Sequence, residues 1–257
     1  MNKGYLSPKE VAYAWVDIGR TKVNYTPKNV FFLALLGGFF VGLGAHAFLV
    51  VTQSLSTIDV GFAKFMGAAV FPVGIMLVVL AGGELFTGNT LIASAWANKE
   101  IRFGQYFRNL SLVYFGNLVG SLLLVYMLHQ SGLYTGLSAE KAIAVAEAKV
   151  SLTFYEAFIR GILCNILVSI AVYMQVASTE VIGKIFALWF PVMLFVLSGY
   201  EHSVANMVFI PLGAVLGGEI DLLKAIMNNF IPVTLGNIVG GSGFIALLYW
   251  NIHVKGN

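Results

Sequence analysis

Long apolar blocks occupy most of this sequence, and they constrain its fold more than any other feature. They cover roughly residues 30–51, 62–97, 106–128, 154–177, 182–216 and 225–250. Each is long enough to cross a bilayer core, which takes about 20 helical residues. Because 58% of the residues are hydrophobic and only 11% are charged, the sequence excludes a soluble or disordered chain. It predicts an all-α integral membrane protein with six transmembrane helices.

The second and fifth blocks are too long for one span, and both contain polar interruptions. Residues 82–89 read GGELFTGN, and residues 198–206 read SGYEHSVAN. Irregular backbone at membrane depth is tolerated only where protein buries it or where it lines a cavity. We therefore predict that helices 2 and 5 are broken.

The two halves of the chain also carry matching motifs. Glu84 and Asn89 recur as Glu201 and Asn206, and the string GNLVG at 116–120 recurs as GNIVG at 236–240, at nearly the same separation. Three spans per half place the second copy upside down relative to the first. The sequence predicts one channel domain over 29–253, with inverted repeats over about 29–129 and 154–250. Midplane substrate sites are built from this arrangement.

The N-terminal segment, residues 1–28, has mixed polarity and lacks the apolar core of a signal peptide. Its residues 10–17 are predicted to form a short amphipathic helix on the membrane surface. With an even number of spans, both termini share a side with most basic residues: Lys3, Lys9, Arg20, Lys22, Lys28, Lys99, Arg102, Arg108, Lys184 and Lys255. That bias predicts cytoplasmic termini in a multi-pass protein of the inner (plasma) membrane. The net charge of +3 is too small and scattered to indicate nucleic-acid binding.

Four strings carry a resemblance to a known family: ELFTGN, YFGNLVGSLL, SGYEHSVANM and IPVTLGNIVGG. Together with the spans and breaks they cover nearly the whole chain, and they resemble the formate/nitrite transporter family. The resemblance implies an aquaporin-like protomer of six helices and a homopentamer with one pore per subunit. It also implies transport of small monovalent anions of weak acids, such as formate, nitrite or hydrosulfide.

The same resemblance implies a set of site residues. A histidine in the second break, a threonine in the first and a lysine in the loop before helix 4 correspond to His202, Thr87 and Lys149. Glu201, Asn165 and Asn237 are carried over with them. The hydrophobic constriction corresponds to Phe71, Ile75, Leu85 and Phe195. No metal and no cofactor is implied.

Physical arguments single out His202 independently. An ionisable side chain at a mid-membrane helix break is a functional-site hypothesis by default, and histidine titrates near physiological pH. The alternative is a packed histidine bonded to a carbonyl. Thr87 starts the second half of helix 2, where its hydroxyl either donates to an anion or only caps the half-helix. Two half-helix N-termini that converge would favour an anion without a permanent charge.

Other polar residues are more ambiguous. Lys149, taken alone, is a solvated loop lysine; folded into the outer vestibule, it would concentrate anions. Arg160 stands where an apolar residue is expected, and either adds to that field or pairs with Glu156. Glu84 is expected to satisfy N–H groups freed by its break, and Glu201 either meets the side chain of His202 or bonds freed backbone groups around its own break. Small residues of the first span allow close packing either between subunits or within one: Gly37, Gly38, Gly42, Gly44 and Ala45.

These features favour a channel for weak-acid anions, formate above all, with a proton supplied at His202. Nitrite, hydrosulfide, lactate and acetate remain alternatives within the same family, and a neutral-solute channel is the alternative outside anion transport. An intramembrane enzyme is disfavoured, because His202, Glu201, Glu84 and Cys164 contain neither a Glu-x-x-His nor a Cys-x-x-Cys spacing. The expected partners are the anion, protons, the bilayer and four further copies of the chain.

Overall fold

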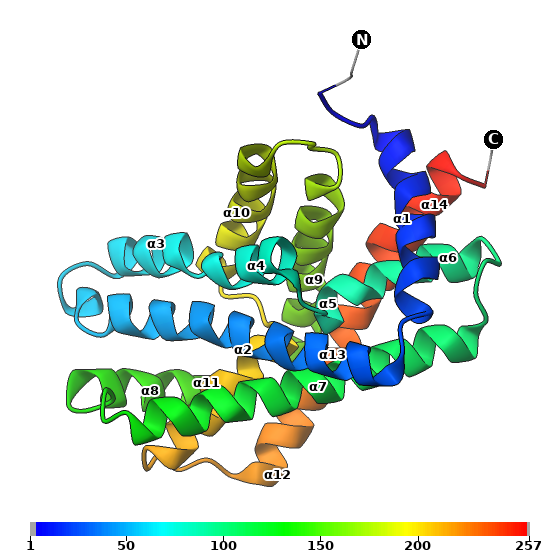
Figure 1. Ribbon diagram of the computed structural model, residues 1–257. Coiled ribbons are helices and arrows are strands. Elements are labelled where there is room, and N and C mark those ends of the chain that lie inside the picture. The colour runs from blue at the N-terminus through cyan, green and yellow to red at the C-terminus, as the bar shows by residue number, and fades with distance from the viewer. Residues whose placement is uncertain (1–3, 256–257) are drawn as a thin grey trace.

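The chain folds as a bundle of helices, seen here in a computed structural model that describes residues 4–255. Within that range the secondary structure is helical, apart from one isolated bridge between Tyr5 and Ser178. Figure 1 shows long helices stacked side by side, with short helical segments between and across them. The described part begins inside the predicted N-terminal segment 1–28, whose first three residues lie outside the described range.

The first half contains α1 to α7. Helices α1 and α2 cover Pro8–Val23 and Pro27–Thr52, and a short 3₁₀ turn at Leu55–Thr57 follows. The second block then forms α3 (Val60–Val70), α4 (Val73–Leu77), a π-helical stretch at Val78–Gly82, α5 (Phe86–Asn89), a 3₁₀ turn at Thr90–Ile92 and α6 (Ala93–Ala97). Helix α7 covers Phe103–Gln130.

The second half contains α8 to α14. These are α8 (Leu137–Val150), α9 (Phe154–Gln175), α10 (Val181–Leu197), α11 (Ser203–Val215), α12 (Leu222–Lys224), α13 (Ile231–Ile238) and α14 (Leu248–His253). Two π-helical stretches, Ala225–Phe230 and Val239–Leu247, join α12 to α13 and α13 to α14 into one continuous helix.

Five continuous helices of the described chain are long and apolar enough to cross a membrane. They are Pro27–Thr52, Val60–Gly82, Phe103–Gln130, Phe154–Gln175 and Leu222–His253. The remaining apolar block is divided between the shorter helices α10 and α11. The chain is therefore a membrane protein in which the second and fifth apolar blocks are interrupted where the sequence predicts.

Both interruptions begin at a glycine with a left-handed backbone. Gly82 has φ of 94° and Gly199 has φ of 71°, a region that residues with a Cβ rarely adopt. The chain then runs extended for a few residues, and helices resume at Phe86 and Ser203. Glycine at these two positions ends one half-helix and turns the chain toward the next.

Glycines also set the spacing between the paired long helices. A Cβ on Gly38 of α2 would overlap the carbonyl oxygen of Asn117 on α7, and one on Gly240 would overlap the carbonyl oxygen of Ile162 on α9. The small residues of α2 are buried against other parts of the same chain. Of the two uses predicted for them, the structure supports packing within the protomer.

We expect Gly120→Ala to destabilise the protein strongly. The new Cβ would lie closer to the backbone oxygen of Leu35 than Cβ atoms lie to any heavy atom in real proteins. Overpacking of this kind costs about 1–3 kcal/mol or more. Gly104→Ala is the matched control, since it lies on the same helix α7 and its Cβ would meet nothing within 4 Å. The thermal midpoint of each variant in detergent should fall only for Gly120→Ala, and equal midpoints would contradict this account of the crossing.

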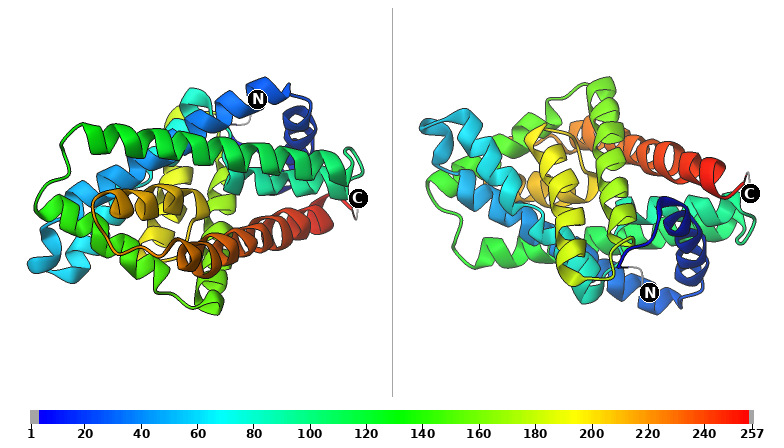
Figure 2. Two further views of the ribbon diagram at one scale, coloured as in Figure 1. Left: turned by 90° about the horizontal axis from the view of Figure 1, so that it is seen from below. Right: turned by 90° about the horizontal axis from the view of Figure 1, so that it is seen from above.

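Helix α1 is longer than the predicted segment 10–17 and packs on the body of the protein. Ser7 and Glu10 form a capping box at its start, and Val11, Ala12 and Trp15 are buried. Figures 1 and 2 show α1 beside α14 and α6 at one end of the bundle, whereas α8 lies at the opposite end. The buried face of α1 therefore covers its own chain, not a lipid surface.

Candidate functional site

Asn117 holds the first helix break in place. Its Nδ2 donates to the carbonyl oxygens of Ala34, at 2.7 Å, and Glu84, at 2.8 Å. Its Oδ1 accepts the backbone N–H of Phe86, at 2.9 Å. One buried amide thus satisfies both ends of the break, as buried backbone groups require.

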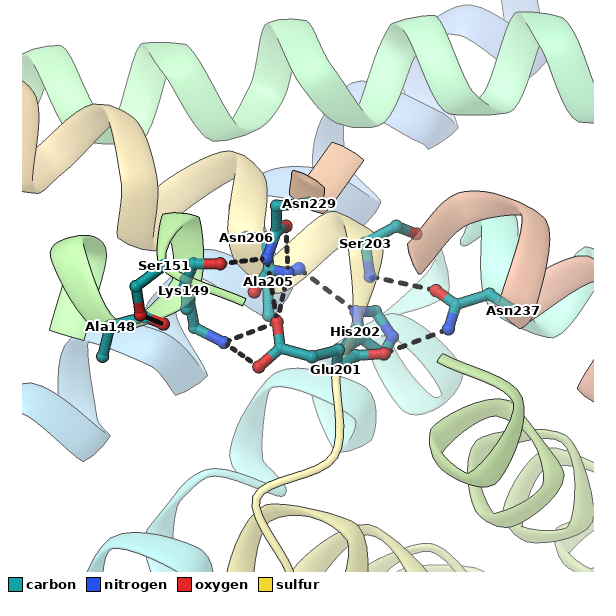
Figure 3. A network of polar contacts seen from close by, with 10 residues as sticks. All are labelled: Ala148, Lys149, Ser151, Glu201, His202, Ser203, Ala205, Asn206, Asn229 and Asn237. Carbon is teal, nitrogen blue, oxygen red and sulfur yellow. Dashed lines mark hydrogen bonds and ion pairs between the residues drawn. The ribbon is translucent and has the colours of Figure 1, made fainter. Parts of the chain in front are cut away.

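Asn237 does the same at the second break. Its Nδ2 donates to the carbonyl oxygens of Gly161, at 2.8 Å, and Glu201, at 3.0 Å. Its Oδ1 accepts the N–H of Ser203, at 2.9 Å, and Figure 3 shows this contact. The two asparagines of the repeated GN motif are therefore equivalent in position and in bonding.

The prediction that Glu84 and Glu201 satisfy the freed backbone groups is wrong, because the asparagines do so. The carboxylate of Glu201 instead accepts from the ammonium of Lys149 at 3.0 and 3.1 Å, and from Nδ2 of Asn206 at 2.7 Å and Asn229 at 3.3 Å. Asn206 also donates to Oδ1 of Asn229. Figure 3 shows this group as one connected network.

A matching network surrounds Glu84 on the other side of the breaks. Its carboxylate accepts from Lys22 Nζ and from Asn89 Nδ2, each at 2.5 Å. Asn89 also donates to Oδ1 of Asn109 at 2.9 Å, and Lys22 donates to Oδ1 of Asn89 at 3.1 Å. Each half of the chain thus carries an ion pair between a partly buried lysine and a buried glutamate, stabilised by two asparagines.

Lys149 lies near the end of α8, so the prediction that it belongs to a loop is wrong. Helix α8 forms because residues 137–150 are rich in alanine and glutamate, which favour helix. Six residues of the networks were not predicted as site residues: Lys22, Glu84, Asn89, Asn109, Asn206 and Asn229. The repeat of Glu84 and Asn89 as Glu201 and Asn206 already signalled three of them, whereas no motif contains Lys22, Asn109 or Asn229.

Thr87 and His202 meet between the two breaks. Thr87 Oγ1 lies 3.0 Å from His202 Nε2, and both side chains are buried. His202 caps α11, because its Nδ1 accepts the backbone N–H of Ala205 at 3.1 Å. An accepting Nδ1 assigns the proton of the neutral ring to Nε2, so the imidazole donates toward Thr87.

Thr87 does not cap its half-helix. The residue before α5 is Leu85, which makes no side-chain cap bond, and the Thr87 hydroxyl is directed at His202 instead. Asn165 secures this region, since its Nδ2 donates to the carbonyl oxygens of Asn237, at 2.6 Å, and Thr87, at 3.2 Å. The side chain of Asn165 therefore links α5, which follows the first break, to α13, whose Asn237 holds the second break.

Two hollows approach this pair from opposite ends of the bundle. The first, of about 240 Å³, is lined by Lys149, Glu201, His202, Phe71 and Phe195 among others, and we call it the Lys149 vestibule. The second, of about 360 Å³, is lined by Lys22, Glu84, Ile75 and Leu85 among others, and we call it the Lys22 vestibule. Each vestibule combines a lysine–glutamate pair with apolar side chains.

The predicted constriction residues are divided between the two vestibules. Phe71 and Phe195 pack edge to face, with ring centroids 5.7 Å apart, and Phe195 stacks on His202 at 5.8 Å. Ile75 and Leu85 are buried on the side of the Lys22 vestibule. The Thr87–His202 pair thus has apolar residues on either side.

The described residues offer polar donors but no metal centre. No group of three or more His, Cys, Asp or Glu side chains within residues 4–255 lies close enough to hold a metal ion. The first turns of α5 and α11 lie beside Thr87 and His202. Side chains already accept the N–H groups of Phe86, Ser203 and Ala205, so the attraction for negative charge comes from the helix dipoles. What this arrangement can do is hold a small anion between two helix ends.

Comparison with known proteins identifies the family of this chain. The sequence profile described as formate/nitrite transporter matches residues 9–251. The chain belongs to the formate/nitrite transporter family. Its relatives in this family are named as transporters and channels.

Two relatives and one solved structure illustrate the similarity. A probable formate transporter of Methanothermobacter thermautotrophicus is 40% identical over 274 residues, covering 99% of this chain and 100% of the relative. The formate channel FocA of Escherichia coli K12 is 36% identical over 273 residues, covering 98% and 96%. A solved pentameric formate channel with formate bound superposes with a TM-score of 0.82 at 36% identity, covering 89% of this chain and 98% of that one.

Proposed function

We propose that this protein is a membrane channel for small monovalent anions of weak acids, with formate as the principal substrate. The observation that carries the proposal is the buried Thr87–His202 pair, which lies between two vestibules and beside two half-helix N-termini. The names of the relatives support formate in particular.

The proposed path runs from one vestibule to the other past the pair. An anion gains hydrogen bonds from the Thr87 hydroxyl and the His202 Nε2–H, and the helix ends add positive potential. Carrying a bare anion past Phe195 and Phe71 would cost several kcal/mol or more, since no water solvates it there. A proton delivered to the anion at His202 removes most of that cost.

The proton passed to the anion comes from water in the Lys149 vestibule, which His202 lines. Because Nδ1 accepts from Ala205, the ring can give its Nε2 proton to the anion only if Nδ1 takes up a proton from water, which breaks the cap bond of α11. The ring regains its first tautomer, and the cap re-forms, when Nε2 takes a proton from water and Nδ1 releases one, so one proton passes from water to the anion in each cycle. Net transport is then proton–anion symport, driven inward by an acidic outside.

We also propose the assembly and topology that the sequence predicts. The six-span, aquaporin-like protomer forms a homopentamer, as the solved relative does. Helices α1 and α14 are neighbours at one end of the bundle, so both termini share a side. The excess of basic residues on that side favours the cytoplasmic face of the inner membrane.

Uptake by proteoliposomes tests the proposal. Formate, nitrite, hydrosulfide, acetate, lactate and a neutral solute of similar size would be offered at two external pH values. We expect formate uptake to exceed that of protein-free liposomes by about tenfold or more, which corresponds to ~1.4 kcal/mol of barrier, and to rise at the lower pH. Faster passage of the neutral solute than of every anion would contradict anion selectivity.

A further inference from the structure

Arg160 and Leu33 occupy equivalent positions in the two halves. The backbone N–H of Glu201 donates to the carbonyl oxygen of Arg160 at 3.3 Å, and the N–H of Glu84 donates to that of Leu33 at 2.9 Å. The next residue in each case, Gly161 or Ala34, accepts from the asparagine that holds the break. Helix α9 therefore repeats α2, with arginine in one copy and leucine in the other.

The two side chains line opposite vestibules. Leu33 lines the Lys22 vestibule, where the charged lining residues are Lys22 and Glu84. These two form an ion pair, so their charges cancel. Arg160 lines the Lys149 vestibule, where Lys149 and Glu201 are paired in the same way. The lining of that vestibule therefore has two positive side chains, Lys149 and Arg160, and one negative side chain, Glu201.

No carboxylate in the described part of the chain forms an ion pair with Arg160. Glu156, one turn earlier on α9, was the predicted partner. Its Oε2 instead accepts from the backbone N–H and the hydroxyl of Thr153, at 2.9 and 2.8 Å, in a capping box. Glu156 interacts with the charge of Arg160 through space and not as an ion pair. It is exposed to solvent, where its field is screened more than that of a charge inside a vestibule.

We infer that Arg160 captures the anion in the Lys149 vestibule and makes the two ends of the path electrostatically unequal. Lys149 adds little net field because Glu201 neutralises it, so the attraction of that vestibule for an anion comes from the guanidinium of Arg160. A cleft with one sign of charge and low-dielectric walls raises the local concentration of its counter-ion. The Lys22 vestibule lacks this excess charge, because leucine stands in its place. This inference rests on the proposed anion transport.

Arg160→Leu tests the inference with little risk to the fold, because leucine already occupies the equivalent position in the other half. Formate uptake by proteoliposomes would be measured against formate concentration at low and at high ionic strength. For Arg160→Leu at low salt we expect KM to rise about 3- to 10-fold, at the low end of steering effects, with the maximal rate changed less than about twofold. The salt dependence of KM should flatten at the same time.

Two matched variants make the result specific. Arg160→Lys keeps the charge and should keep the wild-type KM. Lys141→Leu removes one charge from α8 without touching the vestibule lining, and its KM should stay near that of the wild type. The inference is overturned if Arg160→Leu leaves KM unchanged, if Lys141→Leu raises it equally, or if Arg160→Lys behaves like Arg160→Leu. A wild-type protein without formate uptake would instead refute the proposed transport itself.

Discussion

The His202→Asn protein is expected to transport formate at least about tenfold more slowly at acidic external pH than the wild type, a loss of ~1.4 kcal/mol or more in barrier stabilisation. Asparagine is a good N-cap residue, and its Oδ1 can accept the Ala205 N–H that His202 Nδ1 accepts now. The substitution therefore keeps α11 capped and leaves an amide donor that ends one bond short of the Nε2 position facing Thr87. It removes the titratable ring and its stacking on Phe195.

The pH profile of uptake distinguishes a histidine-controlled step from simple entry of formic acid. Simple entry of formic acid depends on pH only through the concentration of formic acid in bulk water, which is the same for every variant. Transport through the His202 ring adds a dependence on the protonation of that ring. We therefore expect the pH profile of wild-type uptake to differ in shape from that of His202→Asn. If both proteins share one pH profile, the proton-relay part of the proposal is wrong, and the role of His202 as a donor to the anion is unaffected.

His202→Ala provides a second comparison. Alanine removes the cap of α11 as well as the ring, and loss of an N-cap side chain costs about 0.5–2 kcal/mol. We expect a lower thermal midpoint for His202→Ala than for His202→Asn. A shared loss of uptake with different midpoints would separate the chemical role of the ring from its structural one.

Much of the fold follows from the sequence because membranes impose simple rules. Apolar blocks of spanning length, and polar interruptions that a lipid-facing helix would not tolerate, predict the helices and both breaks. The repeated GN motif predicted the equivalence of the halves, and the structure gives Asn117 and Asn237 identical bonding roles. The glycines of α2 were assigned to close packing, and only the structure decided that they pack within the protomer.

The polar networks were harder to predict, because their members come from elements far apart in the chain. Lys22 lies in an N-terminal segment that looks like a surface helix, yet it reaches Glu84 in the interior. Lys149 lies in a polar stretch whose sequence predicts a loop. In the structure it lies in the last turn of α8, and its ammonium bonds Glu201 at the second break. Nothing in their local sequence signals a buried partner. The equivalent positions of the two lysines in the two vestibules are visible only from their ion pairs with Glu84 and Glu201 in the structure.

The Asn237→Ala protein is expected to lose both stability and transport. Three hydrogen bonds of one amide, to Gly161, Glu201 and Ser203, hold the second break. Alanine would leave the Ser203 N–H and the Glu201 carbonyl oxygen without that partner in a buried region, whereas the Gly161 carbonyl lies inside α9, where it also accepts a helical N–H. Each unsatisfied group costs about 1–3 kcal/mol, so we expect a total of ~2 kcal/mol or more.

Asn251→Ala is the matched control for this loss, because Asn251 is an exposed asparagine on α14. Thermal midpoints in detergent and formate uptake in proteoliposomes would be measured for both proteins. Asn237→Ala should show a clearly lower midpoint and little uptake. Ser203 would lose its bond to the Asn237 side chain, which holds the N-terminus of α11 beside Thr87. Asn117→Ala should show the same loss at the first break, since its amide bonds Ala34, Glu84 and Phe86 in the equivalent way. If either variant behaves like Asn251→Ala, the repeated asparagines do not hold the breaks, and the converging helix ends must be fixed by other contacts.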